Sequence, residues 1–172
     1  YFLSRICRRL LELGRRPIGW DEILEGGPPT GAAVMCWHGH EGGLTAARLG
    51  LDAVMADSAQ VYLNHYQADP ATEPLSHGYE LPIALVYRFA PVPSGLDAAT
   101  ARHILGGQGA LWTEYIPNMK HLEYMMFPRA CALAERLWLP PEQCDYPDFL
   151  HRLRRHRRLM DRHRVNAHIL PL

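Results

Sequence analysis

An aromatic ring and a carboxylate lie two positions apart in the stretch GGQGALWTEY, which covers residues 106–115. If this stretch ends a β-strand, Trp112 and Glu114 project from one face, because alternate residues of a strand share a face. A sugar ring offers an apolar C–H face that an indole can cover and hydroxyls that a carboxylate can accept. The spacing is therefore compatible with a sugar-binding position, and equally with a core tryptophan beside a solvated glutamate.

Three more aromatic residues come at or just after the ends of short apolar runs that predict strands: Trp20, Trp37 and Tyr62. In a parallel α/β barrel, side chains at the carboxyl ends of the strands converge on the active-site face. Core aromatic residues would more often fall in mid-strand. The placement of these three residues and Trp112 therefore favours the lining of a single pocket over a purely structural role.

Apolar runs alternate with helical patterns along the chain, which predicts parallel strands joined by helices. Strands are predicted over residues 16–20, 32–37, 51–57 and the run that ends at Trp112. Helices are predicted over residues 4–15, 41–50, 121–138 and 147–164, with a short one in the stretch GLDAATARHILGG. Gly14 is expected to end the first helix, and Pro128 to kink or delay the helix that contains it. The proline-rich residues 65–93 are expected to form an irregular functional loop layer.

The composition is that of a globular protein with one core: 172 residues, 48% hydrophobic and 21% charged. Lys plus Arg and Asp plus Glu number 18 each, so no overall field attracts nucleic acid or anionic membrane. No apolar run approaches the roughly 20 residues of a membrane-spanning helix. We expect no nucleic-acid partner and no membrane partner. The four cysteines are widely separated, which predicts free thiols rather than a zinc site or a disulfide framework.

Five motifs appear in the order RRPIGWDEILEGG, AVMCWHGHEGG, VYLNHYQ, ILGGQGALWTEYIP and EYMMFPRACALAERLW. Together they resemble the C-terminal half of the catalytic domain of family 20 glycoside hydrolases, the β-N-acetylhexosaminidases. The resemblance covers nearly the whole chain. It implies an α/β fold that forms the C-terminal half, about strands 5 to 8, of a (β/α)8 TIM barrel. Residues 1–172 would then be a partial catalytic domain that lacks the N-terminal half of the barrel, in agreement with a helical pattern already under way at Tyr1.

The resemblance also implies exo-acting removal of terminal N-acetylglucosamine or N-acetylgalactosamine by a substrate-assisted retaining mechanism. In that mechanism the acetamido oxygen of the sugar attacks its own anomeric carbon, and no enzyme carboxylate is glycosylated. The catalytic Asp–Glu pair is expected upstream of this chain, so the chain alone is expected to be inactive. The expected partners are an N-acetylhexosamine-containing glycan and the missing half of the barrel. No cofactor is expected, and a periplasmic or secreted location is compatible with the family.

Residue by residue, the resemblance assigns Trp20, Trp37 and Trp112 to the walls around the acetamido group. It assigns Tyr62 to the hydroxyl that stabilises the acetamido oxygen, and Glu114 to the acceptor of sugar hydroxyls. Asn64 departs from the pattern, because the family usually has Asp two residues after this tyrosine. An amide can still bind a hydroxyl, but without charge assistance the contact should be weaker.

Other interpretations stay open for three features. The pair Asp21–Glu22 is expected to be structural, through charge pairing or capping, because consecutive strand residues face opposite ways and cannot both reach one glycosidic oxygen. His38 and His40 follow a strand, as in metal-dependent barrel hydrolases, but Gly42 and Gly43 indicate a turn and no further ligand is identified, so no metal is expected. Asn64 would also permit a non-catalytic amino-sugar-binding protein.

The stretch HRLRRHRRLMDRHR, residues 151–164, is rich in basic residues and could be read as a nucleic-acid contact. Its interleaved Leu153, Leu159 and Met160 make it amphipathic, which favours an outer helix with a solvated charged face. The stretch contains no aromatic residue on which a base could stack.

Overall fold

The computed structural model describes residues 1–170 and consists of two compact units. Unit 1 contains Tyr1–Ser58 and Pro91–Gln108. Unit 2 contains Ala59–Ala90 and the described part of Gly109–Leu172. Each unit holds some of the residues to which the sequence assigns chemistry.

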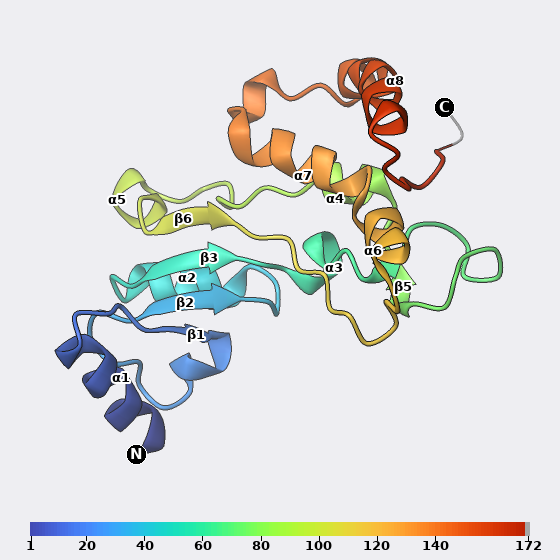
Figure 1. Ribbon diagram of the computed structural model, residues 1–172. Helices are drawn as coiled ribbons and strands as arrows, with labels where there is room; N and C mark the ends of the chain where they lie inside the picture. Colours follow the sequence, from blue (N-terminus) through green and yellow to red (C-terminus); the bar gives the residue numbers. More distant parts are fainter. Residues whose placement is uncertain (171–172) are drawn as a thin grey trace. The chain divides into compact units, whose positions relative to one another are not determined.

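Unit 1 is built on a four-stranded sheet in which every neighbouring pair is parallel (Figure 1). The strands, in their order across the sheet, are β1 (Ile18–Trp20), β2 (Ala33–Cys36), β3 (Asp52–Met55) and β6 (Ile104–Gly107). This confirms the predicted α/β class and the parallel sheet. The predicted fourth strand was wrong at its end, since β6 stops at Gly107 and Trp112 lies outside any strand.

Helices of unit 1 follow the predicted order: α1 (Phe2–Glu12), the 3-10 turn η1 (Asp21–Leu24), α2 (Glu41–Arg48) and α5 (Ala98–Ala101). Gly14 follows the end of α1 with φ of +67°, a left-handed conformation that ends helices and favours glycine, as predicted. Helix α2 packs against β2 and β3. It can approach the sheet closely because Gly43 has no Cβ, which would collide with Met55 Sδ.

Unit 2 is mostly helical and contains a small parallel pair of strands. Its elements are α3 (Ser58–Val61, at the boundary), β4 (His65–Tyr66), β5 (His77–Glu80), α4 (Ile83–Tyr87), α6 (Met119–Met126), α7 (Arg129–Trp138), η2 (Pro141–Gln143) and α8 (Tyr146–Arg162). The predicted irregular layer over residues 65–93 was therefore wrong in part. Every residue of β5 is exposed, so this strand has no buried apolar alternation by which sequence could reveal it.

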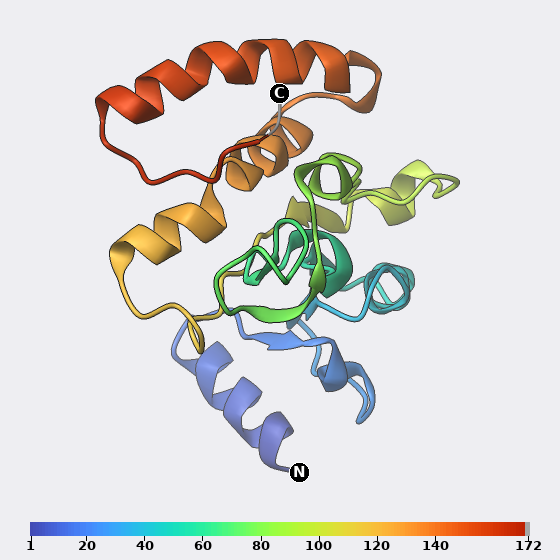
Figure 2. The same cartoon turned by 90° about the vertical axis from the view of Figure 1, so that its right-hand side faces the viewer.

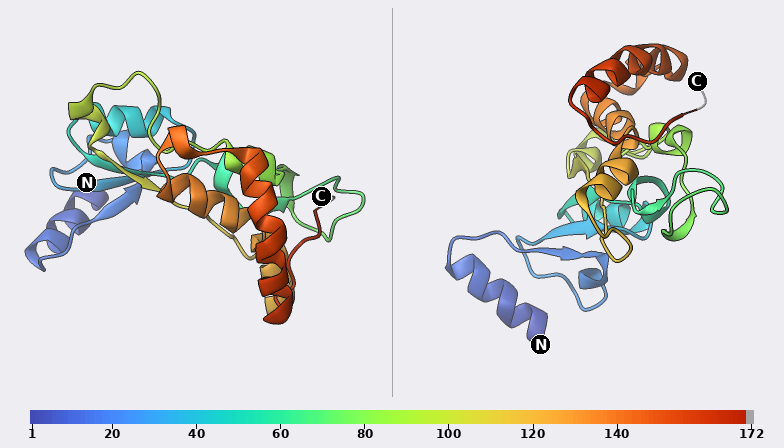
Figure 3. Two further views of the ribbon diagram at one scale, coloured as in Figure 1. Left: turned by 90° about the horizontal axis from the view of Figure 1, so that it is seen from above. Right: turned by 45° about the vertical axis from the view of Figure 1, so that its right-hand side comes forward.

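The predicted helix over residues 121–138 is divided at Pro128 into α6 and α7, because Phe127 adopts an extended conformation before the proline. Helix α7 packs against α4, and α8 crosses α7, with which it lines a common cavity (Figures 2 and 3). The predicted buried stripe of α8 is confirmed at Phe149, Leu153 and Met160. Within residues 1–170, no helix combines the length and the apolar character that crossing a membrane requires.

Candidate functional site

The two tryptophans of unit 1 lie at the carboxyl ends of neighbouring strands. Trp20 is the last residue of β1, and Trp37 follows directly after β2. The parallel register pairs Trp20 with Met35, so Trp37 comes two positions further along the adjacent strand. Trp20 is exposed and Trp37 is half-buried. The prediction that Trp20 ends a strand is confirmed, whereas β2 stops one residue before Trp37.

The turn after β2 is fastened to η1 by side-chain hydrogen bonds. Trp37 Nε1 donates to Glu22 Oε1 at 3.1 Å. The backbone N–H of His38 donates to Asp21 Oδ2 at 3.2 Å, and His38 Nδ1 lies 3.0 Å from Asp21 Oδ1. Both carboxylates thus make hydrogen bonds within the fold, as expected of a structural pair, and no side-chain capping bond is made at η1 among the described residues. The reason given for that expectation was wrong, since the pair lies in a 3-10 turn rather than in an extended strand.

The same residues form the one group of potential metal ligands found within residues 1–170. Ligand atoms of Asp21, Glu22 and His38 all lie within 4.8 Å of one another. Hydrogen bonding accounts for this grouping, because Asp21 pairs with His38 and Glu22 accepts the Trp37 indole N–H. His40, the second histidine of the predicted H-x-H pair, lies outside the group, at the N-cap of α2.

Unit 2 brings Tyr62 and Trp112 together. Their ring centroids are 6.1 Å apart at an interplanar angle of 60°, an edge-to-face arrangement that is favourable for aromatic pairs. Backbone hydrogen bonds hold the two segments side by side: Ala110 N donates to Val61 O at 3.0 Å, and Leu63 N donates to Ala110 O at 2.7 Å. Tyr62 is 9% exposed and Trp112 is 43% exposed, so the pair reaches the surface through the indole.

Asn64 lies two residues after Tyr62 and is only 5% exposed. Its Oδ1 is buried and has no hydrogen-bond partner within the described part of the chain. A buried acceptor without a donor costs about 1–3 kcal/mol. A ligand hydroxyl can reach this acceptor only when the atoms that cover it move aside.

Glu114 is exposed and lies in a segment without regular secondary structure. The prediction that Trp112 and Glu114 share a strand face was wrong in its premise, because no strand covers these residues. Glu114 borders a cavity of about 430 Å³, and Trp112 is not among its lining residues. Apart from Glu114, that lining consists of Leu75, Thr113, Tyr115, Ile116, Pro117 and His121.

Sequence reasoning missed two buried residues, His65 and Arg129, in or next to the segment that follows Tyr62. His65 stacks on Tyr79 with ring centroids 4.3 Å apart, and its Nδ1 lies 2.9 Å from the carbonyl oxygen of His77. Burial lowers the pKa of His65, so the imidazole stays neutral below its ordinary range. Arg129 is fully buried beneath the loop. An arginine inside the apolar stretch FPRACALA was the available signal, because arginine is almost never buried without partners.

Residues 1–141 match the family described as glycosyl hydrolase family 20, catalytic domain. The chain belongs to glycosyl hydrolase family 20. It is 41% identical over 170 residues to a β-hexosaminidase of Porphyromonas gingivalis, an alignment that covers 98% of this chain and 22% of that relative. The chain thus spans about a fifth of that relative's length.

Solved structures of family 20 proteins have a similar fold. The exo β-N-acetylglucosaminidase of Vibrio harveyi in complex with N-acetylglucosamine matches with a TM-score of 0.85 and 32% identity, over 98% of this chain and 27% of that chain. The β-N-acetylhexosaminidase of Streptomyces coelicolor matches in fold with a TM-score of 0.87 at 23% identity, over 99% of this chain and 36% of that chain. The family 20 catalytic domain is a TIM barrel, and a parallel sheet with covering helices is the architecture of such a barrel.

Proposed function

We propose that this chain is part of an exo-acting β-N-acetylhexosaminidase, which removes terminal N-acetylglucosamine or N-acetylgalactosamine from glycans. The observation that carries the proposal is the grouping in unit 2 of this family 20 chain. There the Tyr62 phenol meets the half-exposed Trp112 indole, and Asn64, two residues after Tyr62, has a buried acceptor without a hydrogen-bond partner in the described part of the chain. An aromatic surface, a hydroxyl donor and an amide acceptor are the groups that an N-acetyl sugar requires.

In the proposed reaction, the acetamido oxygen forms a bond to the anomeric carbon as the bond to the leaving oxygen breaks. The leaving oxygen takes a proton from a general acid. Water then gives a proton back to the general acid and attacks the anomeric carbon as the bond from that carbon to the acetamido oxygen breaks, so two inversions give overall retention. The Tyr62 hydroxyl donates a hydrogen bond to the acetamido oxygen and holds it in line with the anomeric carbon, which contributes through orientation.

The remaining roles concern binding. In unit 2, Trp112 covers the acetamido group beside Tyr62 and restricts it to the reactive orientation. Trp20 and Trp37 of unit 1 are assigned to the same group by the family resemblance. Glu114 and Asn64 accept hydrogen bonds from sugar hydroxyls, and the Asn64 contact is the weaker of the two because an amide carries no charge. No cofactor takes part in this scheme.

We further propose that residues 1–172 correspond to strands 5 to 8 of the barrel, and that the catalytic Asp–Glu pair lies in the preceding half. The share of the Porphyromonas gingivalis relative that the chain covers, 22%, supports a partial domain. So do the outer strands β1 and β6, each of which has a strand neighbour on one side within unit 1. The chain alone should then be inactive, and co-expression with the preceding half should give activity. Turnover by the isolated chain would contradict this assignment.

The test of the function compares two chromogenic substrates of the full-length protein. We expect release of nitrophenol from 4-nitrophenyl N-acetyl-β-D-glucosaminide and none from 4-nitrophenyl β-D-glucoside, which lacks the acetamido nucleophile. Equal cleavage of both would overturn the substrate-assisted mechanism. Binding of N-acetylglucosamine without any cleavage would instead identify an amino-sugar-binding protein.

A further inference from the structure

Arg129 is the largest fully buried side chain in the described part of the chain, with 0% exposure. Burying a guanidinium is unfavourable unless every N–H group is satisfied. Burial lowers the pKa of Arg129 to about 9, while the negative charge of Glu73 acts in the opposite direction. Because burying the Arg129 guanidinium is unfavourable, we expect a role that an apolar side chain at this position could not have.

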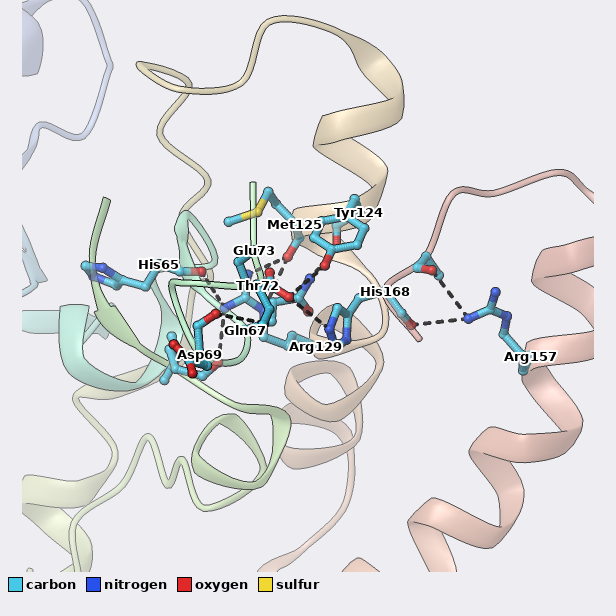
Figure 4. A network of polar contacts seen from close by, with 12 residues as sticks. His65, Gln67, Asp69, Thr72, Glu73, Tyr124, Met125, Arg129, Arg157 and His168 are labelled. Atoms are coloured by element: carbon cyan, nitrogen blue, oxygen red, sulfur yellow. Dashed lines mark hydrogen bonds and ion pairs between the residues drawn. The ribbon is translucent and has the colours of Figure 1, made fainter. Parts of the chain in front are cut away.

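The guanidinium donates all of its hydrogen bonds to backbone carbonyls of unit 2 (Figure 4). Nη1 donates to His65 O at 2.9 Å and to Leu81 O at 3.1 Å. Nη2 donates to Leu63 O and to Met125 O, and Nε donates to Met125 O at 3.3 Å. Five N–H donors thus meet four carbonyl oxygens from three separate segments.

Two of these carbonyls belong to the residues on either side of Asn64, and Leu63 directly follows Tyr62. The same short segment is held from the other side by the hydrogen bond from Leu63 N to Ala110 O. The backbone between Tyr62 and His65 is therefore fixed at both of its faces. Such a clamp determines the direction in which the Tyr62 and Asn64 side chains point.

A second layer of polar contacts closes the network around Glu73. Tyr124 Oη donates to Glu73 Oε1 at 2.7 Å, and His168 Nε2 lies 3.2 Å from the same oxygen. Residues 62–67 are called the clamped loop below, and Gln67 at its end donates to the carbonyl oxygen of Tyr124. Figure 4 shows these side chains gathered around the guanidinium. The loop that follows Tyr62 is thus tied to α6 both directly and through Arg129.

We propose that Arg129 is a positioning residue for sugar hydrolysis: by clamping the Leu63 and His65 carbonyls it holds Tyr62 and Asn64 in the orientation that the N-acetyl sugar requires. This inference rests on the proposed function. Arg129 acts through the loop and does not contact the sugar. A group misplaced by about 1 Å can lower a rate about 100-fold, so the clamp has a kinetic consequence beyond stability.

The experiment is a double-mutant cycle of Arg129→Lys and Tyr62→Phe in the full-length protein, measured with 4-nitrophenyl N-acetyl-β-D-glucosaminide. Lysine keeps the charge but cannot bind four carbonyls at once. If Arg129 acts through Tyr62, Arg129→Lys lowers kcat at least about 10-fold in the wild-type background and less than about 3-fold in the Tyr62→Phe background. Equal factors in both backgrounds would overturn the proposal.

Two control variants separate positioning from general destabilisation. Arg136→Lys alters another arginine of α7, which donates to the carbonyl oxygen of Phe89 at 2.9 Å, away from the clamped loop. Leu153→Ala destabilises unit 2 from the buried face of α8. Both should leave kcat within about 2-fold of wild type at a temperature where all variants are folded by circular dichroism. Leu153→Ala and Arg129→Lys are compared at equal loss of Tm. If both then lose the same factor in kcat, the role of Arg129 is structural only.

The outcome also distinguishes this inference from the function on which it rests. A wild-type protein that neither cleaves the substrate nor binds N-acetylglucosamine overturns both. An active wild type with additive variants overturns the positioning role alone. If the wild type binds the sugar without cleaving it, the same cycle is run on Kd, and additivity there again overturns the role.

Discussion

Two segments carry groups that we assign to the sugar, and they are held in opposite ways. In unit 1, buried Asp21 holds His38, whereas the Trp37 indole N–H donates to the exposed carboxylate of Glu22. In unit 2, the loop of Tyr62 is fastened from below by the fully buried Arg129. Exposed hydrogen bonds exchange easily with water, whereas buried donors cannot be replaced. We infer that the Trp37 indole can change its position, whereas the Tyr62 hydroxyl is held in one orientation.

The largest effect is expected for Arg129→Met, which removes the charge and leaves four carbonyls without their donor. We expect the free energy of unfolding to fall by about 3–5 kcal/mol, the usual result of breaking a buried charged network. Chemical denaturation measures this loss. Arg136→Met, which removes a single hydrogen bond to a carbonyl, should cost about 1 kcal/mol. Similar losses in the two variants would show that the buried network of Arg129 contributes no more stability than a single arginine–carbonyl hydrogen bond.

Asn64→Asp tests the proposed contact between the clamped loop and a sugar hydroxyl. Within the clamped loop, a carboxylate would accept a sugar hydroxyl with charge assistance and gain about 1 kcal/mol, which corresponds to roughly a 5-fold lower KM. Steady-state kinetics on the aryl N-acetylglucosaminide measure this change. An unchanged or higher KM would contradict the assignment of Asn64 to a sugar hydroxyl.

The clamped loop should also be the acid-sensitive segment. Burial lowers the pKa of His65 below its ordinary 6.5, so the unfolded chain binds the proton first as pH falls. Stability conferred by neutral His65 is therefore complete above about pH 6.5 and is lost progressively as pH falls toward the lowered pKa of the folded state.

Denaturation at pH 7.5 and 5.5 tests this expectation. His168, whose pKa is also lowered by burial, contributes in the same direction, so the informative quantity is the difference between proteins. His65→Gln should lose less stability between the two pH values than wild type. The exposed control His151→Gln should behave as wild type. Equal pH dependence in all three proteins would remove His65 as the source of acid sensitivity.

The smallest effect is expected at the other segment. Glu22→Gln keeps an oxygen that can accept the Trp37 indole N–H, so stability should change by less than about 0.5 kcal/mol. Glu22→Ala removes the acceptor and should cost about 0.5–1.5 kcal/mol, with a modestly higher KM because Trp37 is less restricted. Thermal unfolding and kinetics measure both. If Glu22→Ala lowered the free energy of unfolding as much as Arg129→Met, the exposed hydrogen bond of Trp37 would be as important for stability as the buried network of Arg129.

The sequence predicted those parts of the fold that follow from apolar patterns. The runs that became β2 and β3 were correctly placed, because buried parallel strands are short, continuous and apolar. The run of β1 was also correctly placed, although two of its three residues are exposed. The buried stripe of α8 was also predictable from the sequence, since its apolar residues recur at helical spacing. The exposed β5 was missed because pairing of backbone groups, rather than side-chain burial, defines it.

The sequence indicated the candidate site residues by their type, but it did not indicate the contacts that hold them in place. Trp20 was correctly placed at a strand end and Trp37 directly follows one, while Trp112 lies further beyond its strand and owes its place to the backbone pairing of Ala110. Arg129 was missed because its partners are carbonyl oxygens, which every residue carries and no sequence pattern marks. Contacts between segments far apart in the chain decide such positions, and a linear pattern does not encode them.

The proposed mechanism depends most on the acetamido group acting as the nucleophile. The direct measurement is kcat/KM of the full-length protein for aryl β-glucosaminides whose N-acetyl group carries an increasing number of fluorine atoms. Fluorine withdraws electrons from the acetamido oxygen, so the mechanism predicts a stepwise and steep fall in kcat/KM along the series. A kcat/KM that stays constant along the series would contradict it.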